Sequence, residues 1–375
     1  MNLFILVLTP FLLYLLQGIL EQKYWNKNLS ASVTFQDAPC VCGEEGSLKE
    51  TVVNAKLLPL SILRVKFKIG RELKFVTEEN TAVTDYTYRN DVFSVFPYQK
   101  ITRTLKFVCG KRGYYELDSL DLVSHDLFFT GHMVQSVPLS SHLYVYPAGA
   151  DLERLNVPFQ KMVGTVLSRN RLCRDPFEFQ TIREYQTYDT MRMVNWKATA
   201  RTGELKVNVH EPTASQSILL LLNMDSETAW ASEALREEAI SICGSLASAF
   251  IREGIPVGII SNGIDCLTGQ PTEVKPGAGP EHEKSCLETL SRLGYDGALL
   301  PFEEMVRGQN RGKEDSLCVM ISSCQRRELL EAYEESCRMS PGSIWIAPLR
   351  PEDEVREGGC PSAMWLKWEV SYDKV

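Results

Sequence analysis

Seven chemically versatile side chains lie within a short stretch near the middle of this 375-residue chain. They are Arg183, Tyr185, Asp189, Arg192, Trp196, Lys197 and Arg201. Guanidinium groups form bidentate, charge-assisted hydrogen bonds with carboxylates, and a buried indole needs an acceptor for its N–H. One interpretation is a polar clasp between two domains, in which Asp189 pairs with arginines above a buried Trp196. The other is a docking surface for a partner, with Lys197 and Arg201 facing outward.

A second group of oxygen-bearing side chains follows the apolar run SILLLL at residues 217–222. Asn223, Asp225 and Glu227 alternate along the chain there. Carboxylate and amide oxygens are the ligands that Mg²⁺ prefers, and ligands of open α/β sheets collect at the carboxyl ends of strands. A magnesium site is one interpretation. A solvated turn explains the same residues, and we favour the turn, so that no cofactor is predicted.

Nucleophilic catalysis needs a serine or cysteine, a histidine base and an orienting acid. The chain has only five histidines, and none follows a G-x-S-x-G or similar elbow. It also has neither a G-x-G-x-x-G turn between strand and helix nor a G-x-x-x-x-G-K-[ST] loop. The sequence therefore predicts a protein that is not an enzyme, with an uncharacterised enzyme as the least favoured alternative.

Charge and cysteine content narrow the class of protein further. A net charge of −8 and a pI near 5.4 argue against nucleic acid as a partner. The 11 cysteines are odd in number and scattered, unlike a disulfide framework. Cys40 and Cys42 form a C-x-C pair with no second pair of ligands near them in sequence, which favours ordinary thiols over a metal site.

The N-terminus carries an uncharged apolar run, LFILVLTPFLLYLLQGIL, at residues 3–20. Such a run is at the lower end of what crosses a bilayer as a helix. A cleaved signal peptide is the rival, but Met1–Asn2 is not basic and no small-x-small site precedes Glu21. Lys23 and Lys27 follow the run, so the positive-inside rule predicts a single-pass cell-membrane protein whose soluble domains are cytoplasmic.

Two soluble domains must position the residues above. Short segments rich in Val, Thr, Phe and Tyr fill residues 29–150 and predict an immunoglobulin-like β-sandwich. Strands alternate with helices across residues 213–375, which predicts a parallel α/β sheet. The expected strands there are 217–222, 255–263, 316–323, 343–349 and 364–372, and the expected helices are 232–254, 281–294 and 325–339. Residues 1–28 form the anchor and its flank, and residues 151–212 form a connector. The predicted fold class is thus multidomain α and β.

The connector resembles the signature of the bacterial domain of unknown function 58 family. The stretch RDPFEFQTIREYQTYDTMRMVNWKATARTGEL matches the family pattern Arg-x-Tyr-x-x-Gly-Asp-x-x-Arg-x-Ile-x-Trp-x-x-x-Ala-Arg. The matching positions are Arg183, Tyr185, Asp189, Arg192, Trp196, Ala200 and Arg201. The chain departs from the pattern at Tyr188, where the family has Gly, and at Val194. KRGYYEL at residues 111–117 resembles a second motif of the family.

The resemblance implies more than the residues alone. It implies a membrane-anchored protein with a β domain and a von Willebrand factor type A-like domain. It also implies association with a MoxR-type AAA+ ATPase and with a transglutaminase-like membrane protein. A type A metal site would map to Asn223, Asp225 and Glu227, which depart from Asp-x-Ser-x-Ser.

Our leading hypothesis is a non-enzymatic, membrane-anchored interaction or scaffold protein that is the adaptor of such an ATPase. The alternative is an extracytoplasmic, metal-dependent adhesion or ligand-binding protein.

Overall fold

We describe the chain from a computed structural model, in which it divides into two compact units at residues 1–148 and 149–375. The structure describes residues 8, 14, 16–37, 39–77, 79–125, 131–152, 159–160, 162–164, 166, 181–185, 191, 194–209, 217–225, 233–295, 299–310, 316–339, 342–356, 358 and 364–370.

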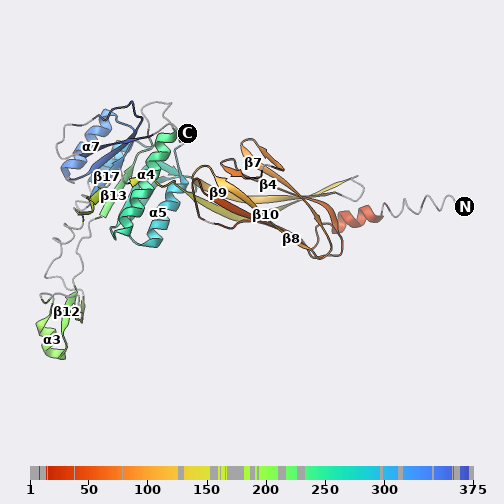
Figure 1. Cartoon of the computed structure of the whole chain (residues 1–375), viewed down its shortest axis with the longest axis horizontal. Helices are drawn as coiled ribbons and strands as arrows, with labels where there is room; N and C mark the ends of the chain where they lie inside the picture. Colours follow the sequence, from red (N-terminus) through yellow and green to blue (C-terminus); the bar gives the residue numbers. More distant parts are fainter. Residues whose placement is uncertain are drawn as a thin grey trace. The chain divides into compact units, whose positions relative to one another are not determined.

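The first unit contains two β-sheets (Figure 1). The four-stranded sheet has the order β1 (Leu29–Phe35), β3 (Glu45–Asn54), β8 (Lys100–Cys109) and β5 (Leu73–Phe75). The six-stranded sheet has the order β2 (Cys40–Val41), β10 (His132–Tyr146), β9 (Gly113–His125), β4 (Leu60–Gly70), β7 (Tyr86–Val95) and β6 (Thr81–Val83). All neighbours are antiparallel except β2 and β10.

One hydrophobic core lies between these two sheets. Buried and less buried residues alternate along β3, as expected for a strand with one face on a core. Leu48 and Phe107 from the four-stranded sheet share this core with Leu63 and Leu120 from the six-stranded sheet. All four side chains are almost completely buried. Burial of such side chains, at about 25 cal/mol per Å² of apolar area, holds the two sheets together.

Strand β7 turns two charged residues toward the core, besides the apolar Phe93 and Val95. Its charged residues Arg89 and Asp91 are buried, whereas Tyr86, Tyr88 and Val92 are exposed. The Arg89 guanidinium donates to both carboxylate oxygens of Asp91, from Nε at 2.9 Å and from Nη2 at 3.1 Å. A charge inside a core is tolerated when it is paired and hydrogen-bonded in this way.

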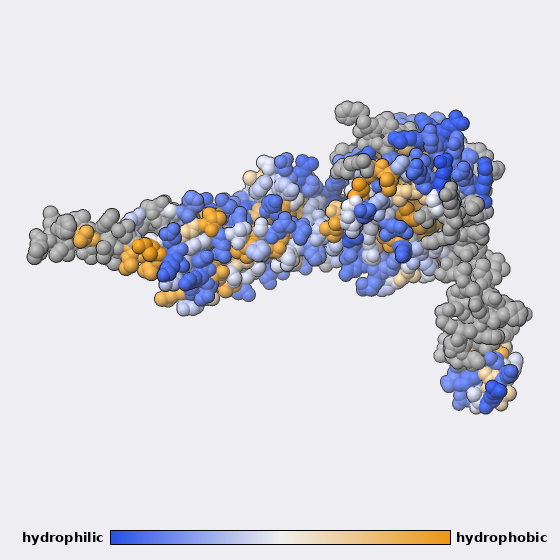
Figure 2. Space-filling view, turned by 180° about the vertical axis from the view of Figure 1, so that it is seen from behind, coloured by the Kyte–Doolittle hydropathy of each residue, from blue (hydrophilic) through white to orange (hydrophobic). Residues whose placement is uncertain are grey.

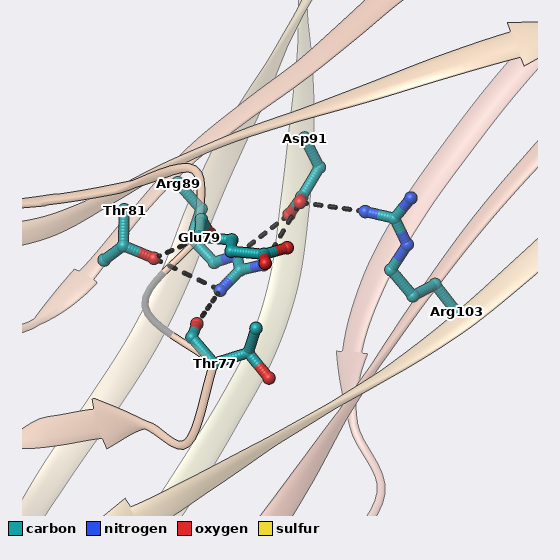
Figure 3. A network of polar contacts seen from close by, with 6 residues as sticks. All are labelled: Thr77, Glu79, Thr81, Arg89, Asp91 and Arg103. Carbon is teal, nitrogen blue, oxygen red and sulfur yellow. Dashed lines mark hydrogen bonds and ion pairs between the residues drawn. The ribbon is translucent and has the colours of Figure 1, made fainter.

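The same network reaches the other sheet (Figure 3). Arg103, on β8, donates from Nη1 to Asp91 Oδ1 at 2.9 Å. The remaining nitrogen of Arg89 donates to the Thr77 carbonyl oxygen and to the Thr81 hydroxyl. One carboxylate thus joins β7 of the six-stranded sheet to β8 of the four-stranded sheet.

The second unit contains a seven-stranded sheet with helices on both faces. The main strand order is β15 (Pro271–Gly277), β14 (Val257–Asp265), β13 (Ser217–Leu222), β17 (Ser316–Ile321), β18 (Ile344–Leu349) and β19 (Met364–Glu369), and β16 (Leu293–Gly294) also pairs with β14. The helices are α4 (Glu233–Arg252), α5 (Pro280–Arg292), α6 (Phe302–Asn310) and α7 (Arg327–Met339).

Strand β13 is buried along its whole length because both faces of the sheet are covered. Leu220 and Leu222 pack in a core with residues of α4 and α5. Leu219 and Leu221 point to the opposite face, into a core with residues of α6 and α7. This central strand therefore carries no polar side chain between Ser217 and Asn223, and its functional groups are confined to its ends.

The predicted fold class is wrong in two respects. First, the sheet of the second unit is mixed: β15 and β16 both run antiparallel to β14. A tight turn after Asp265, with Gly269 at φ +67°, returns the chain directly beside β14, which no helical crossover could do. Strands also dominate the described architecture more than the prediction of alternating strands and helices implied.

Second, the predicted transmembrane helix is not found. In the part of the chain that the structure describes, no helix is both long and apolar enough to cross a membrane. The helical residues 16–24 run into the polar stretch Glu21-Gln22-Lys23, and a span needs about 20 apolar residues. The predicted single-pass membrane location, and the membrane as a partner, are corrected by this finding.

Candidate functional site

The segment singled out by the sequence forms a small module of its own. Strands β11 (Thr181–Glu184) and β12 (Lys206–Val209) pair antiparallel, and helix α3 (Trp196–Thr202) lies between them in the chain (Figure 1). Val194 forms an isolated bridge with Val207, and both side chains are buried. Two short strands bury little apolar area, so local hydrogen bonds must hold the module together.

Helix α3 is fixed at both ends by its own sequence. At the N-cap, Asn195 Oδ1 accepts the Ala198 N–H at 2.9 Å. At the C-cap, Gly203 adopts φ +76°, which an L side chain rarely adopts, and donates its N–H to the Thr199 carbonyl oxygen. The Thr199 hydroxyl accepts the backbone N–H of Lys206 at 3.0 Å, which ties the helix to β12. Capping therefore makes a helix of only seven residues well defined.

The capped helix α3 presents its side chains to solvent. Helix α3 has no buried residue, and Trp196 is 62% exposed. Lys197 and Arg201 are also exposed and lie one helical turn apart. Hydrophilic and hydrophobic residues occur side by side on the described surface of this segment (Figure 2). The expectation that Trp196 is buried is therefore wrong, because α3 packs its caps and not its indole against the strands.

The other motif residues are distributed as follows. The backbone of Arg183 pairs with that of Val207, within β11 and β12. Tyr185 is half-buried, and its backbone N–H donates to the Leu205 carbonyl oxygen at 2.9 Å. Asp189 and Arg192 lie outside the described residues. The pairing of Asp189 with the two arginines consequently stays a prediction.

The second candidate group lies where β13 and β17 end side by side. Asn223 is buried and donates from Nδ2 to Ser322 Oγ at 3.0 Å. Its Oδ1 accepts the backbone N–H of Asp225 at 2.9 Å. The Ser322 hydroxyl in turn donates to the Cys324 carbonyl oxygen at 3.0 Å. Asn223 thus joins two strand ends, and its oxygen already serves as an acceptor within the protein.

Asn262 is a residue of this edge that the sequence reasoning missed. It lies on β14, is completely buried, and accepts the Met224 N–H at 2.9 Å. Its amide donates to the Leu300 carbonyl oxygen at 3.2 Å. An amide directly after the largely apolar run IPVGIIS at residues 255–261 was the signal, since a buried amide must find partners.

The carboxyl group of Asp225 lies against these partners. Burial raises its pKa, and the nearby Arg326 guanidinium opposes that shift. Glu303 also raises the pKa, while hydrogen bonds from the Phe302 backbone and from the Asn262 side chain lower it. Among the described residues, no three His, Cys, Asp or Glu side chains gather closely enough to hold a metal ion. Glu227 lies outside those residues, so the magnesium interpretation stays a prediction.

Comparison with known proteins finds a family that matches the region beginning at this module. Residues 181–298 match the family described as "Protein of unknown function DUF58". The resemblance predicted from the signature motif is therefore confirmed over that region of the chain.

The chain is 24% identical over 208 residues to "Uncharacterized protein YeaD" of Bacillus subtilis (strain 168). The match covers 54% of this chain and 49% of that protein, so the chain spans about half the length of this relative.

Solved structures resemble parts of the chain weakly. The CARDB domain of the PF1109 protein from Pyrococcus furiosus is 14% identical, with 31% of this chain and 93% of that chain covered and a TM-score of 0.20. A non-cellulosomal cohesin from Archaeoglobus fulgidus is 10% identical, with 31% and 91% covered and a TM-score of 0.20. Neither likeness carries a functional argument.

The expected partners need a correction after these findings. The MoxR-type AAA+ ATPase and the transglutaminase-like membrane protein were expected together with a membrane anchor, and that anchor is not found among the described residues. The family match supplies no partner of its own.

Proposed function

We propose that this chain is a non-enzymatic interaction protein and that residues 194–205 form its docking surface for another protein. The observation that carries the proposal is the exposed Trp196 on a helix without a buried residue. Exposing a large aromatic ring to water has no benefit for the isolated module. Tryptophan and arginine are the residues that most often dominate the energy of protein–protein interfaces.

The charges beside Trp196 define the partner's chemistry. Lys197 and Arg201 make no hydrogen bond or ion pair with the described residues, in contrast to Lys206, which binds Glu184 and Glu204. Two cations next to an apolar ring fit a protein with an apolar pocket bordered by carboxylates. The caps of α3 fix the helix before binding, which reduces the entropy lost on association.

Among the described residues, one pair of side chains resembles a catalytic nucleophile and its base, namely Cys286 and His282. The contacts of this pair support a function without catalysis. The two side chains lie 3.5 Å apart on α5. However, His282 Nε2 lies 2.7 Å from the Val257 carbonyl oxygen, so this nitrogen donates its proton there and cannot accept one from the thiol. Burial raises the pKa of Cys286 to about 11, so its thiol stays neutral and unreactive.

Site-specific photocrosslinking in the native host tests the docking surface. A photoreactive phenylalanine analogue replaces Trp196 in one variant, and the matched control carries it at Tyr98, which is also well exposed. We expect a defined protein adduct from position 196 that disappears when Lys197→Glu and Arg201→Glu are added. The same adduct from position 98, or an adduct indifferent to the charge reversal, would contradict the proposal.

The captured protein then allows a quantitative measurement. With both proteins purified, Trp196→Ala should weaken binding by at least about 30-fold, the effect of losing roughly 2 kcal/mol at an interface hot spot. The melting temperature should remain unchanged, because Trp196 supports no buried contact.

A further inference from the structure

Three cysteines from distant parts of the sequence converge at one end of the β-sandwich. Cys40 and Cys42 belong to the C-x-C pair at β2, and Cys109 is the last residue of β8. Cys40 and Cys109 are buried, whereas Cys42 is partly exposed. This cluster is independent of the docking surface on α3, which lies in the other unit.

The backbone explains why these residues meet. The β2 strand pairs with β10, with Cys40 opposite Val145, and so belongs to the six-stranded sheet. A few residues later the chain has entered the four-stranded sheet. There Gly43 donates its N–H to the Cys109 carbonyl oxygen at 2.7 Å, and Cys109 donates its own to Glu44 at 3.0 Å. Cys40 and Cys109 therefore face each other from different sheets.

The two buried thiols interact with each other and with the backbone near β2. The Cys40 thiol donates to the Asp37 carbonyl oxygen at 2.8 Å. Burial is the main cause that raises the pKa of both thiols, that of Cys109 to about 12. A side-chain hydrogen bond between the two thiols lowers the pKa of Cys40 and raises that of Cys109. Of the two, Cys40 is the thiol that more readily gives up its proton and acts as a nucleophile.

A metal does not account for the cluster. The three thiols are not among any group of described side chains placed to hold a metal ion. The Cys40 sulfur lies beside Gly46 of β3, and its interaction with the Cys109 thiol makes the two side chains neighbours, as a disulfide requires. We propose that Cys40 and Cys109 form a reversible disulfide between the two sheets, and that Cys42 is the thiol at which an oxidising low-molecular-weight disulfide enters.

The exchange balances in three steps. The Cys42 thiolate attacks the small disulfide RSSR, which forms Cys42–S–S–R and releases the first RS⁻. The Cys40 thiolate then attacks the Cys42 sulfur, and the second RS⁻ leaves. Finally this RS⁻ takes up the proton of Cys109, and the Cys109 sulfur attacks the Cys40 sulfur and releases the Cys42 thiolate. Two thiols of the protein are oxidised and RSSR is reduced to two RSH.

The bond would link strands that the sequence separates by nearly seventy residues. Closing a loop of this length restricts the unfolded chain strongly. Oxidation should therefore raise the melting temperature of the first unit, and a thiol reductant should reverse the rise.

Peptide mapping of the intact, folded chain tests the proposal. The reduced protein is incubated with glutathione disulfide, the remaining thiols are alkylated, and the digest is analysed without reduction. We expect a peptide pair that joins Cys40 to Cys109 and a higher melting temperature. A mixed disulfide at the exposed Cys266 shows in the same digest that the reagent has acted.

Variants separate the roles of the three thiols. Cys109→Ser should abolish the bridge and the rise in melting temperature, while Cys42→Ser should slow bridge formation and leave its product the same. The proposal is overturned if Cys40 and Cys109 remain unlinked while Cys266 is modified. It is also overturned if the stable product joins Cys42 to Cys109, or if Cys42→Ser leaves the rate unchanged.

Discussion

Glu50 and Asp91 are two carboxyl groups buried in one core, yet only Asp91 is hydrogen-bonded to guanidinium groups. The Asp91 carboxylate accepts hydrogen bonds from Arg89 and Arg103, whereas neither carboxyl oxygen of Glu50 has a hydrogen-bond partner among the described residues. Glu50 is 1% exposed and lies opposite Arg103 in the β3–β8 ladder. Burial raises the pKa of Glu50 to about 8, and the negative charge of Asp91 adds to the shift against the opposing effect of the two arginines.

We predict from this relationship that Glu50→Gln removes a dependence of stability on pH. Because the pKa is about 8 in the folded chain and ordinarily 4.5, the native state binds a proton that the unfolded state releases between these values. The free energy of unfolding should thus fall as pH rises from about 5 to about 8, by at most roughly 1.4 kcal/mol per pH unit. Urea unfolding across this interval measures the slope.

Glu45→Gln is the matched control, because Glu45 lies on the same strand and is exposed. It should keep the slope of the parent chain. Equal slopes in the parent chain and in Glu50→Gln would show that Glu50 is ionised in the fold.

Breaking the Arg89–Asp91 pair should destabilise the first unit strongly. Asp91→Ala leaves the buried Arg89 guanidinium without its carboxylate, a loss of about 3–5 kcal/mol in a buried pair. Replacement of both residues, Arg89→Met with Asp91→Leu, should recover most of that loss, since no buried charge then remains. Denaturant unfolding measures the free energy of unfolding of the single and double variants. A double variant as unstable as Asp91→Ala would show that the uncompensated buried charge is not the cause of the loss.

Loss of the helix cap should loosen α3 without unfolding the chain. Asn195→Ala removes the acceptor of the Ala198 N–H and costs about 1 kcal/mol of local stability. Hydrogen exchange at the amide of Ala198 should accelerate several-fold, while amides of β13 stay protected. Asn195→Asp retains a capping oxygen, so its Ala198 amide should exchange at the rate of the parent chain. An unchanged exchange rate at this amide in Asn195→Ala would mean that the cap does not hold the helix.

Magnesium should leave the chain's stability unchanged. The Asn223 oxygen accepts the Asp225 N–H, and the Asp225 carboxyl already receives bonds from Phe302 and Asn262, so a cation would have to replace these contacts. Thermal unfolding with and without millimolar magnesium, in the parent and in Asp225→Asn, is the measurement. A rise in melting temperature that Asp225→Asn abolishes would establish a metal site.

The elements of the second unit were largely predictable from hydrophobic pattern. The apolar run SILLLL is confirmed as the buried strand β13, and the expected helix at 232–254 is confirmed as α4. Periodicity of this kind records burial, which fixes element type. It carries no information on strand direction, and the antiparallel β15 and β16 were therefore missed.

Strand β7 is difficult to recognise in the sequence for a different reason. Its first inward positions hold Thr87, Arg89 and Asp91, and only Phe93 and Val95 follow the usual alternation, so the pattern that predicts a strand points the wrong way over its first half. The exposure of Trp196 was likewise beyond prediction. A motif of charged and aromatic residues fits a buried clasp and an open surface equally well, and the packing of the neighbouring strands decides between them.

The buried charges of β7 have a consequence for how the sandwich selects its strand alignment. A shift of β7 by one residue would turn Tyr86, Tyr88 and Val92 inward and send both charges to water, but it would also expose Phe93 and Val95, which are buried in the observed alignment. The bonds from Arg89 to Asp91 and to Thr77 depend on the alignment that is observed. The buried ion pair and the apolar residues Phe93 and Val95 therefore specify the same pairing of β4 with β7, because a one-residue shift would lose both the hydrogen bonds and the apolar burial.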